Sequence, residues 1–264
     1  MSINRTKIKR ILIPVVSVFS LAVVVLVLLY VNKEQEKITC DDVNVNFLRK
    51  GEGALVSEQE VRDLVMQLCD SAGSGAAGLS TAKLENAIEE LPAVKNAEVY
   101  RRINGELHIE VEQRIPVCRV HELSGSQYYL DESGEPFPVT PAYTARVPLV
   151  NGNLYEPYSM RRGRMDSDSM RVRSKLDDVS ALFRSIRKES FRMALIEQVW
   201  VAENGDFELI PKIDDHVILF GDTTEMDGKF NKLKIFYEEG LNTQGWNSYQ
   251  TVNLKYKNQI ICKK

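Results

Sequence analysis

The sequence predicts an α+β protein: a single N-terminal transmembrane helix, a β-α-α-β-β domain, and a mixed, mostly-β C-terminal domain with two or more helices. Three observations predict this fold. An uncharged segment runs from Ile11 to Val31. Two amphipathic helical patterns lie between strand-like segments in the first half of the remaining chain. Short alternating or continuous apolar segments dominate the second half.

The composition is that of a globular protein, with 44% hydrophobic and 27% charged residues in a chain of 264. The formal net charge is −3, yet residues 1–31 contain four basic residues and no acidic ones. The rest of the chain therefore has 30 basic against 37 acidic residues, a net charge of −7. This acidic body disfavours nucleic acid as the main partner, because phosphate binding needs a basic surface.

The segment from Ile11 to Val31 is expected to be an uncleaved transmembrane helix. A helix of that length spans roughly 30 Å, the thickness of a bilayer core. A signal peptide would have a shorter apolar region followed by small residues at a cleavage site. The basic residues precede the segment, so the positive-inside rule predicts a cytoplasmic tail over residues 1–10. Residues 32–38 are then a linker to a body outside the cytoplasm.

Residues 39–117 are expected to form the first folded domain. Alternating apolar residues predict a strand at Val43–Phe47. A capping box at Ser57–Glu60 begins one helix, and Ser80 begins another. Two further strands are joined by Asn104-Gly105, a strong two-residue hairpin signal. The predicted order is β-α-α-β-β.

Residues 118–264 are expected to form a second domain of strands with at least two helices. Asp131–Gly134 and Asn204-Gly205 predict hairpin turns. A helix capped at Asp166–Asp168 is expected to carry an apolar face that reaches Ile186. The continuous apolar segment Val217–Phe220 predicts a strand buried on both faces, and a further helix follows it.

The four cysteines are spaced too widely for a CxxC motif, which disfavours zinc and thioredoxin-like redox chemistry. Four cysteines allow three disulfide pairings in an oxidising compartment. Buried free thiols are the preferred interpretation, because a body of this size can build a core without disulfides. The residues concerned are Cys40, Cys69, Cys118 and Cys262.

Motifs that suggest catalysis have simpler structural explanations. The G-x-G-x-x-G match at residues 73–78 follows a helix instead of a strand, so no dinucleotide cofactor is expected. The S-x-x-K matches at Ser80 and Ser185 lack the companion motifs of penicillin-recognising enzymes. His108 is expected on the face of its strand opposite Leu107, Ile109 and Val111, toward solvent or a sheet edge. Asp214-Asp215-His216 is expected to be a solvated turn and not a metal site. No enzyme activity, cofactor or metal is expected.

The order of these elements, with particular motifs, resembles the FtsQ/DivIB family of bacterial cell division proteins. One motif is LPAVKNAEVYRRINGELHIEVEQRIPVCRV from Leu91, which resembles the second half of a POTRA domain. Another is QYYLDESGEPFPV from Gln127, and a third is VILFGDTTEMDGKFNKLKIF from Val217, where Phe220 replaces the usual leucine before glycine. The resemblance extends from the N-terminal tail to the second domain.

This resemblance implies a non-enzymatic scaffold of the divisome. It implies a bacterial inner-membrane location with a single pass, a periplasmic body and concentration at the division septum. The implied partners are FtsB and FtsL, whose recruitment helps to control septal peptidoglycan synthesis. The POTRA domain is a secondary candidate for binding other divisome members, through residues around Val43–Phe47 and the hairpin of residues 97–111. A POTRA-type carrier in protein transport or envelope assembly is the alternative, although such proteins tend to have several POTRA repeats or a membrane barrel.

The resemblance also points to the C-terminal strand as the partner site. Alternation over residues 250–256 predicts a strand, and a terminal strand often lies at a sheet edge, where a partner strand can be added. The family's D-L-R-Y-like sequence corresponds here to Asn253-Leu254-Lys255-Tyr256, so asparagine and lysine replace aspartate and arginine. Lysine lacks the bidentate fork of arginine. The expected partner-binding residues are Asn253, Lys255, Tyr256, Asn258 and Ile260.

Overall fold

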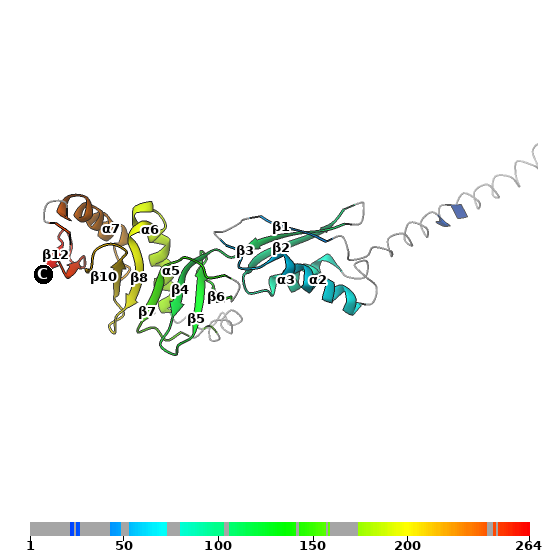
Figure 1. Cartoon of the computed structure of the whole chain (residues 1–264), viewed down its shortest axis with the longest axis horizontal. Coiled ribbons are helices and arrows are strands. Elements are labelled where there is room, and N and C mark those ends of the chain that lie inside the picture. Colours follow the sequence, from blue (N-terminus) through cyan, green and yellow to red (C-terminus); the bar gives the residue numbers. More distant parts are fainter. Residues whose placement is uncertain are drawn as a thin grey trace, which may run out of the picture. The chain divides into compact units, whose positions relative to one another are not determined.

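The described part of the chain forms two compact units (Figure 1). The computed structural model describes residues 22–23, 25–26, 43–48, 53–72, 80–102, 106–140, 143–156, 158, 174–241, 245–246 and 248–264. The first unit includes Val56–Glu112 and the strand before it, and the second includes Gln113–Lys264. Nearly all of the expected transmembrane segment lies outside these residues. No described helix has the length and apolar character needed to cross a bilayer.

The first unit is a three-stranded sheet with two helices, in the predicted β-α-α-β-β order. Strand β3 lies in the centre of the sheet, between β1 and β2. Strands β1 and β3 are parallel, with Val43 opposite Leu107 and Phe47 opposite Val111. The elements are β1 (Val43–Phe47), α2 (Glu58–Ala72), α3 (Thr81–Glu89), β2 (Val94–Arg101) and β3 (Leu107–Gln113).

Local sequence explains why the two helices begin where they do. The Ser57 hydroxyl accepts a hydrogen bond from the Glu60 amide at 3.1 Å, and the Ser80 hydroxyl accepts one from the Lys83 amide at 3.3 Å. Each serine thus caps amide groups that have no partner within the first turn. Val61 and Val65 are fully buried, which places one face of α2 in the core.

The second unit is built on a nine-stranded mixed sheet with helices, and its mostly-β character agrees with the prediction. The strand order is β12-β11-β10-β9-β8-β7-β4-β5-β6. Pairings β4–β7, β7–β8 and β10–β11 are parallel, and the others are antiparallel. The strands are β4 (Pro116–His121), β5 (Gln127–Asp131), β6 (Pro136–Pro138), β7 (Leu149–Gly152), β8 (Ile196–Val201), β9 (Phe207–Pro211), β10 (Val217–Gly221), β11 (Thr251–Asn253) and β12 (Ile261–Lys263).

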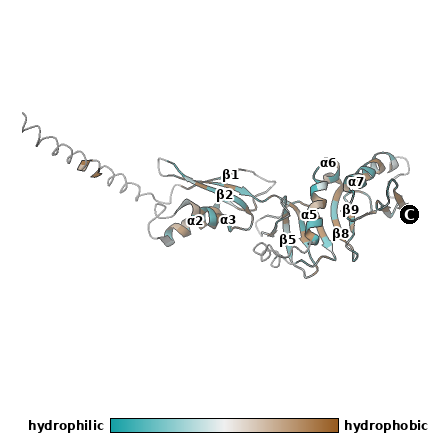
Figure 2. Ribbon diagram, turned by 180° about the vertical axis from the view of Figure 1, so that it is seen from behind, coloured by the Kyte–Doolittle hydropathy of each residue, from teal (hydrophilic) through white to brown (hydrophobic). Residues whose placement is uncertain are grey.

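The helices of this unit pack on the sheet and share one apolar core with it. Brown and teal stretches lie side by side on the ribbons, as expected for elements with one buried face (Figure 2). Phe220 of β10 and Phe230 of α7 meet at this core, with ring centroids 4.8 Å apart. The helices are α5 (Lys175–Ile186), α6 (Ser190–Leu195), α7 (Met226–Ile235) and the π-helix η2 (Phe236–Gly240).

Two predictions about elements of the second unit need correction. Helix α5 begins at Lys175, where Ser174 and Asp177 form a capping box, so its cap is not at Asp166–Asp168. Those aspartates lie outside the described residues. Strand β10 is fully buried on one face but only half-buried at Val217 and Leu219 on the other. The predicted hairpin at Asn204-Gly205 is confirmed, because Gly205 takes the positive φ that the turn requires.

The cysteines also differ from expectation. Cys69 in α2 is disulfide-bonded, which corrects the preference for free thiols at this position. Cys118 and Cys262 are free, and Cys40 lies outside the described residues. Cys118 is fully buried in β4, and this burial raises the pKa of its thiol. A buried neutral thiol of this kind behaves as a small apolar side chain.

Candidate functional site

The expected partner-binding residues gather in the last 14 residues of the chain, at one end of the larger sheet. Asn253 is the last residue of β11 and is half-buried. Lys255, Tyr256 and Asn258 are exposed in the connection between β11 and β12. Ile260, just before β12, packs partly against the core.

The structure changes which strand lies at the sheet edge. The segment expected to be the edge strand, residues 250–256, contains β11, and β11 is paired on both sides, with β10 and β12. Strand β12 occupies the edge instead. The strand also ends earlier than predicted, because the Asn253 side chain accepts a hydrogen bond from the Lys255 amide at 3.0 Å. An asparagine that bonds the backbone two residues later favours a turn over a continued strand.

Lys232 of α7 fixes the connection between β11 and β12. Its ammonium group donates to the backbone carbonyls of Leu254 at 2.9 Å and Tyr256 at 2.6 Å, and more weakly to that of Gln259 at 3.4 Å. Three acceptors match the three donors of a lysine. Burial, followed by the nearby charge of Lys229, lowers the pKa of Lys232. The single side chain of Lys232 thus hydrogen-bonds the backbone near both ends of the exposed connection and holds it against α7.

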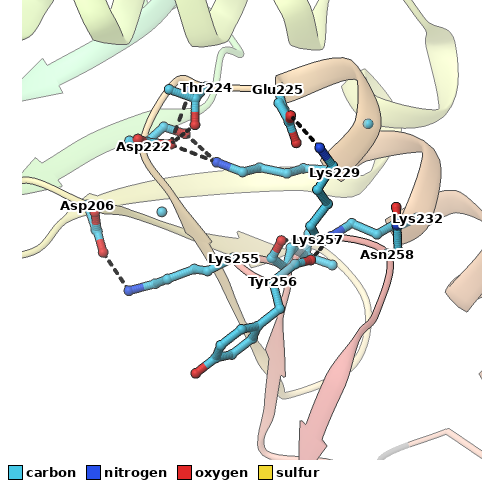
Figure 3. Close-up of a pocket in the computed structure, with 13 residues that line it drawn as sticks. Asp206, Asp222, Thr224, Glu225, Lys229, Lys232, Lys255, Tyr256, Lys257 and Asn258 are labelled. Atoms are coloured by element: carbon cyan, nitrogen blue, oxygen red, sulfur yellow. Dashed lines mark hydrogen bonds and ion pairs between the residues drawn. The ribbon is translucent and has the colours of Figure 1, made fainter.

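This connection forms one wall of a pocket of about 420 Å³ (Figure 3). The other walls come from the turn before β9, the end of β10 and the start of α7. Its charged groups are paired within the chain. Lys255 pairs with Asp206 at 2.5 Å, Lys229 with Asp222 at 2.9 Å, and Lys257 with Glu225 at 3.8 Å. Figure 3 shows the Tyr256 ring projecting away from Lys229 and Asp222.

These pairs shift the acidities of the pocket carboxylates. The hydrogen bonds that Asp222 accepts, first from Thr224 and then from Lys229, lower the pKa of Asp222 to about 2. The hydrogen bond from Lys255 is the largest cause of a lowered pKa at Asp206. Both carboxylates are therefore ionised at neutral pH. The pocket has a mixed charge that suits polar contact with another protein.

The residues singled out as possible catalysts have structural roles. Ser80 caps α3, as described above. Ser185 is buried, and its hydroxyl contacts Arg192 at 3.2 Å, whereas Lys188 pairs with Asp227 at 3.1 Å. The Ser185 hydroxyl also donates to Asp227 at 3.4 Å, so both the serine and the lysine of this S-x-x-K match contact the same carboxylate in a structural ion-pair network. Within the described ranges, no group of three or more histidine, cysteine, aspartate or glutamate side chains is placed to hold a metal ion.

Two predictions about histidines are wrong. His216 is not in a solvated turn, because its side chain is only 1% exposed and bonds the Tyr237 hydroxyl at 2.8 Å. Desolvation by burial lowers its pKa. His108 is buried as well, and its ring stacks on Tyr100 with centroids 5.5 Å apart. Each histidine also lies 3.3 Å from a carboxylate two residues earlier, Asp214 for His216 and Glu106 for His108. The aromatic partners, Tyr237 and Tyr100, come from other elements, which local sequence pattern does not reveal.

Three residues that shape the pocket from α7 and the β8–β9 turn could not be predicted from the sequence pattern, namely Lys229, Lys232 and Asp206. Lys229 is only 7% exposed. Because lysine is seldom buried, a search for apolar periodicity does not predict a lysine in the core. The only local signal is that Lys229 and Lys232 lie three residues apart, on neighbouring positions of a helix. Asp206 lies just after the β8–β9 turn, and its partner Lys255 is 49 positions later in the chain.

Comparison with known proteins matches a family model to each of the two units. The family model "FtsQ/DivIB, C-terminal related" matches residues 115–263, more than half of the chain, and the model "POTRA-like domain" matches residues 38–112. The cell division protein FtsQ of Rhodothermus marinus is 27% identical over 196 residues, covering 72% of this chain and 68% of that protein. The FtsQ of Myxococcus fulvus is 38% identical over 81 residues, covering 30% of this chain and 28% of that protein. The chain belongs to the FtsQ/DivIB family of cell division proteins.

Proposed function

We propose that the protein is a non-enzymatic scaffold of the divisome that recruits FtsB- and FtsL-like proteins through the C-terminal end of its larger sheet. In this proposal one helix over residues 11–31 anchors the chain in the inner membrane. The N-terminus is cytoplasmic, the body is periplasmic, and the protein acts at the septum. Recruitment helps to control peptidoglycan synthesis by other proteins. Family membership and the charge pattern around the apolar segment support the proposal.

The observation that carries the proposal is the position of β12 at the end of the nine-stranded sheet. Among the described strands, only β11 pairs with it, so its other side is available for an added strand. Added strands gain affinity from backbone hydrogen bonds and specificity from side chains. Ile261 in β12 is 44% exposed, and Tyr256 in the connection before β12 is 49% exposed; both can supply apolar contacts.

The paired charges of the pocket suggest how polar specificity arises. The Lys255 side chain is 40% exposed while it bonds Asp206. A partner carboxylate can compete for this lysine at modest cost, because an exposed ion pair contributes little to stability. A single lysine makes a less directional contact with a carboxylate than the arginine of the family pattern would. Apolar contact with Tyr256 is therefore expected to carry more of the affinity.

The test is co-purification of the full chain with FtsB and FtsL homologues from the same genome. Tyr256→Asp is expected to reduce capture at least tenfold, because it puts a charge where an aromatic ring is buried on binding. The melting temperature should be unchanged, since Tyr256 is exposed. Tyr155→Asp is the matched control: Tyr155 is 62% exposed and follows β7, which is separated from β11 by three strands.

Full capture by the Tyr256→Asp protein would refute the assigned site. Equal loss with Tyr155→Asp would show a general surface effect and would refute it as well. Failure of the unsubstituted chain to capture either protein would contradict the divisome proposal. Crosslinking in cells would then identify the partner, with the transport-type carrier as the next hypothesis.

A further inference from the structure

Two carboxylates from α3 bond the outer edge of strand β2 in the first unit. Strand β2 is an edge strand of its three-stranded sheet, and only β3 pairs with it among the described strands. Glu85 accepts a hydrogen bond from the Val99 amide at 2.9 Å, and Glu89 accepts one from the Ala97 amide at 3.1 Å. These backbone N–H groups would otherwise point away from the sheet.

The spacing of the two contacts follows from regular geometry. Residues four apart on a helix are separated by about 6 Å along its axis. Residues two apart on a strand are separated by about 6.6 Å and point in the same lateral direction. Glu85 and Glu89 therefore match Val99 and Ala97 when helix and strand run in opposite directions. The buried side chains of Leu84 and Ile88 hold α3 on the sheet in this register.

We propose that Glu85 and Glu89 are specificity-determining residues that close the β2 edge to strand addition. An added strand must bond the same outward N–H groups. An ionised carboxylate is a strong acceptor for a backbone amide, so a partner's neutral carbonyl competes poorly with it. A strand laid along β2 would also meet the two acidic side chains. Proteins commonly protect edge strands with charged side chains of this kind.

The β1 and β12 edges are protected less. On β1, Arg62 donates to the Val43 carbonyl at 2.8 Å, which occupies one acceptor and no donor. In the described part of the chain no side chain bonds the backbone of Ile261–Lys263 in β12. The carboxylates would thus steer strand-type partners away from β2. Protection of the β2 amides can be measured in the protein alone, without a partner.

The test is amide hydrogen exchange at single-residue resolution in the full chain. Glu85→Ala should speed exchange at Val99 at least tenfold and leave Ala97 nearly unchanged, and Glu89→Ala should do the reverse. Glutamine at either position should restore part of the protection, because its amide oxygen still accepts a hydrogen bond. Glu90→Ala is the control: Glu90 is exposed on the same helix end, and its side chain bonds no other described residue.

A second measurement tests strand addition itself. The probe is a capped peptide with the sequence LHIEVEQ, which is the chain's own β3 and the natural neighbour of β2. The Glu85→Ala/Glu89→Ala protein is expected to bind it at least tenfold more tightly than the unsubstituted chain. Equal binding by the two proteins, or no binding to the double variant, would overturn the proposal. Unchanged exchange at Ala97 and Val99 in the single variants would also overturn it.

Discussion

At the scale of single residues, two lysines of α7 differ in how much they contribute to the folded structure. Lys232 bonds three backbone carbonyls in the connection between β11 and β12. Lys234, two residues later, pairs with one carboxylate, Glu189, at a surface where both side chains are partly exposed. Lys232 therefore fixes the conformation of the backbone, whereas Lys234 forms a surface ion pair that contributes little to stability.

Lys232→Met is expected to destabilise the protein by about 1–2 kcal/mol, because a charged donor to several carbonyls is lost while water can replace part of it. Amide exchange across residues 254–260 should accelerate. Lys234→Met is the matched control and should destabilise the protein much less, because an exposed ion pair contributes little to stability. Urea unfolding and amide exchange measure both effects. Equal destabilisation by the two substitutions would contradict the role given to Lys232.

Asp222 is expected to make stability depend on acid pH. Its pKa is about 2 in the folded protein, below the value of roughly 3.9 in an unfolded chain. A carboxylate with a lowered pKa stabilises the fold above about pH 4, and that contribution disappears as pH falls toward 2. The side chain is 62% exposed, so screening limits the effect to about 1 kcal/mol or less. Asp222→Asn should flatten the urea-unfolding profile over this pH range, and an unchanged profile would contradict the assignment.

At the scale of elements, β11 and β12 differ in how much core they supply. Val252 in β11 and Leu254 after it are fully buried, whereas Ile261 in β12 is 44% exposed. Strand β11 also pairs with β10, so it links the C-terminal hairpin to the rest of the sheet. The hairpin therefore consists of one strand that belongs to the core and one edge strand whose outer side pairs with no other described strand.

Truncation after Gln259 is expected to leave the fold intact, since it removes β12 with only a few partly buried groups. Truncation after Gln250 is expected to unfold much of the second unit, because it removes two fully buried side chains and costs several kcal/mol. Circular dichroism and thermal melting distinguish the two proteins. A cooperative melt for the chain ending at Gln250 at the temperature of the intact chain would contradict this account.

The elements that sequence predicted well are those whose signals are local. Ser57 and Ser80 cap the helices they were expected to cap, and Gly205 forms the expected turn. The end of β11 at Asn253 was missed, because alternation over residues 250–256 outweighed one turn-forming side chain. The π-helix at Phe236–Gly240 was missed as well, since apolar periodicity does not report a wider helical turn.

At the scale of the whole molecule, the sequence was sufficient for the family and the order of elements but not for the site's surroundings. The expected residues Lys255, Tyr256 and Asn258 do lie together beside the pocket, because they are near one another in the chain. Asp206, Asp222 and Lys232 join them only through the pairing of β9, β10 and β11 and the packing of α7. Contacts over such separations come from tertiary structure, which a single sequence pattern does not specify.

The most direct test of partner recruitment is amide exchange of the full chain with and without a purified complex of FtsB and FtsL homologues. Exchange at Ile261–Lys263 is expected to slow at least tenfold in the complex, because an added strand would bond the outer amides of β12. Phe137 in β6, at the opposite edge of the same sheet, should be unaffected. Complex formation with no protection at β12, or with protection confined to the first unit, would contradict the central claim.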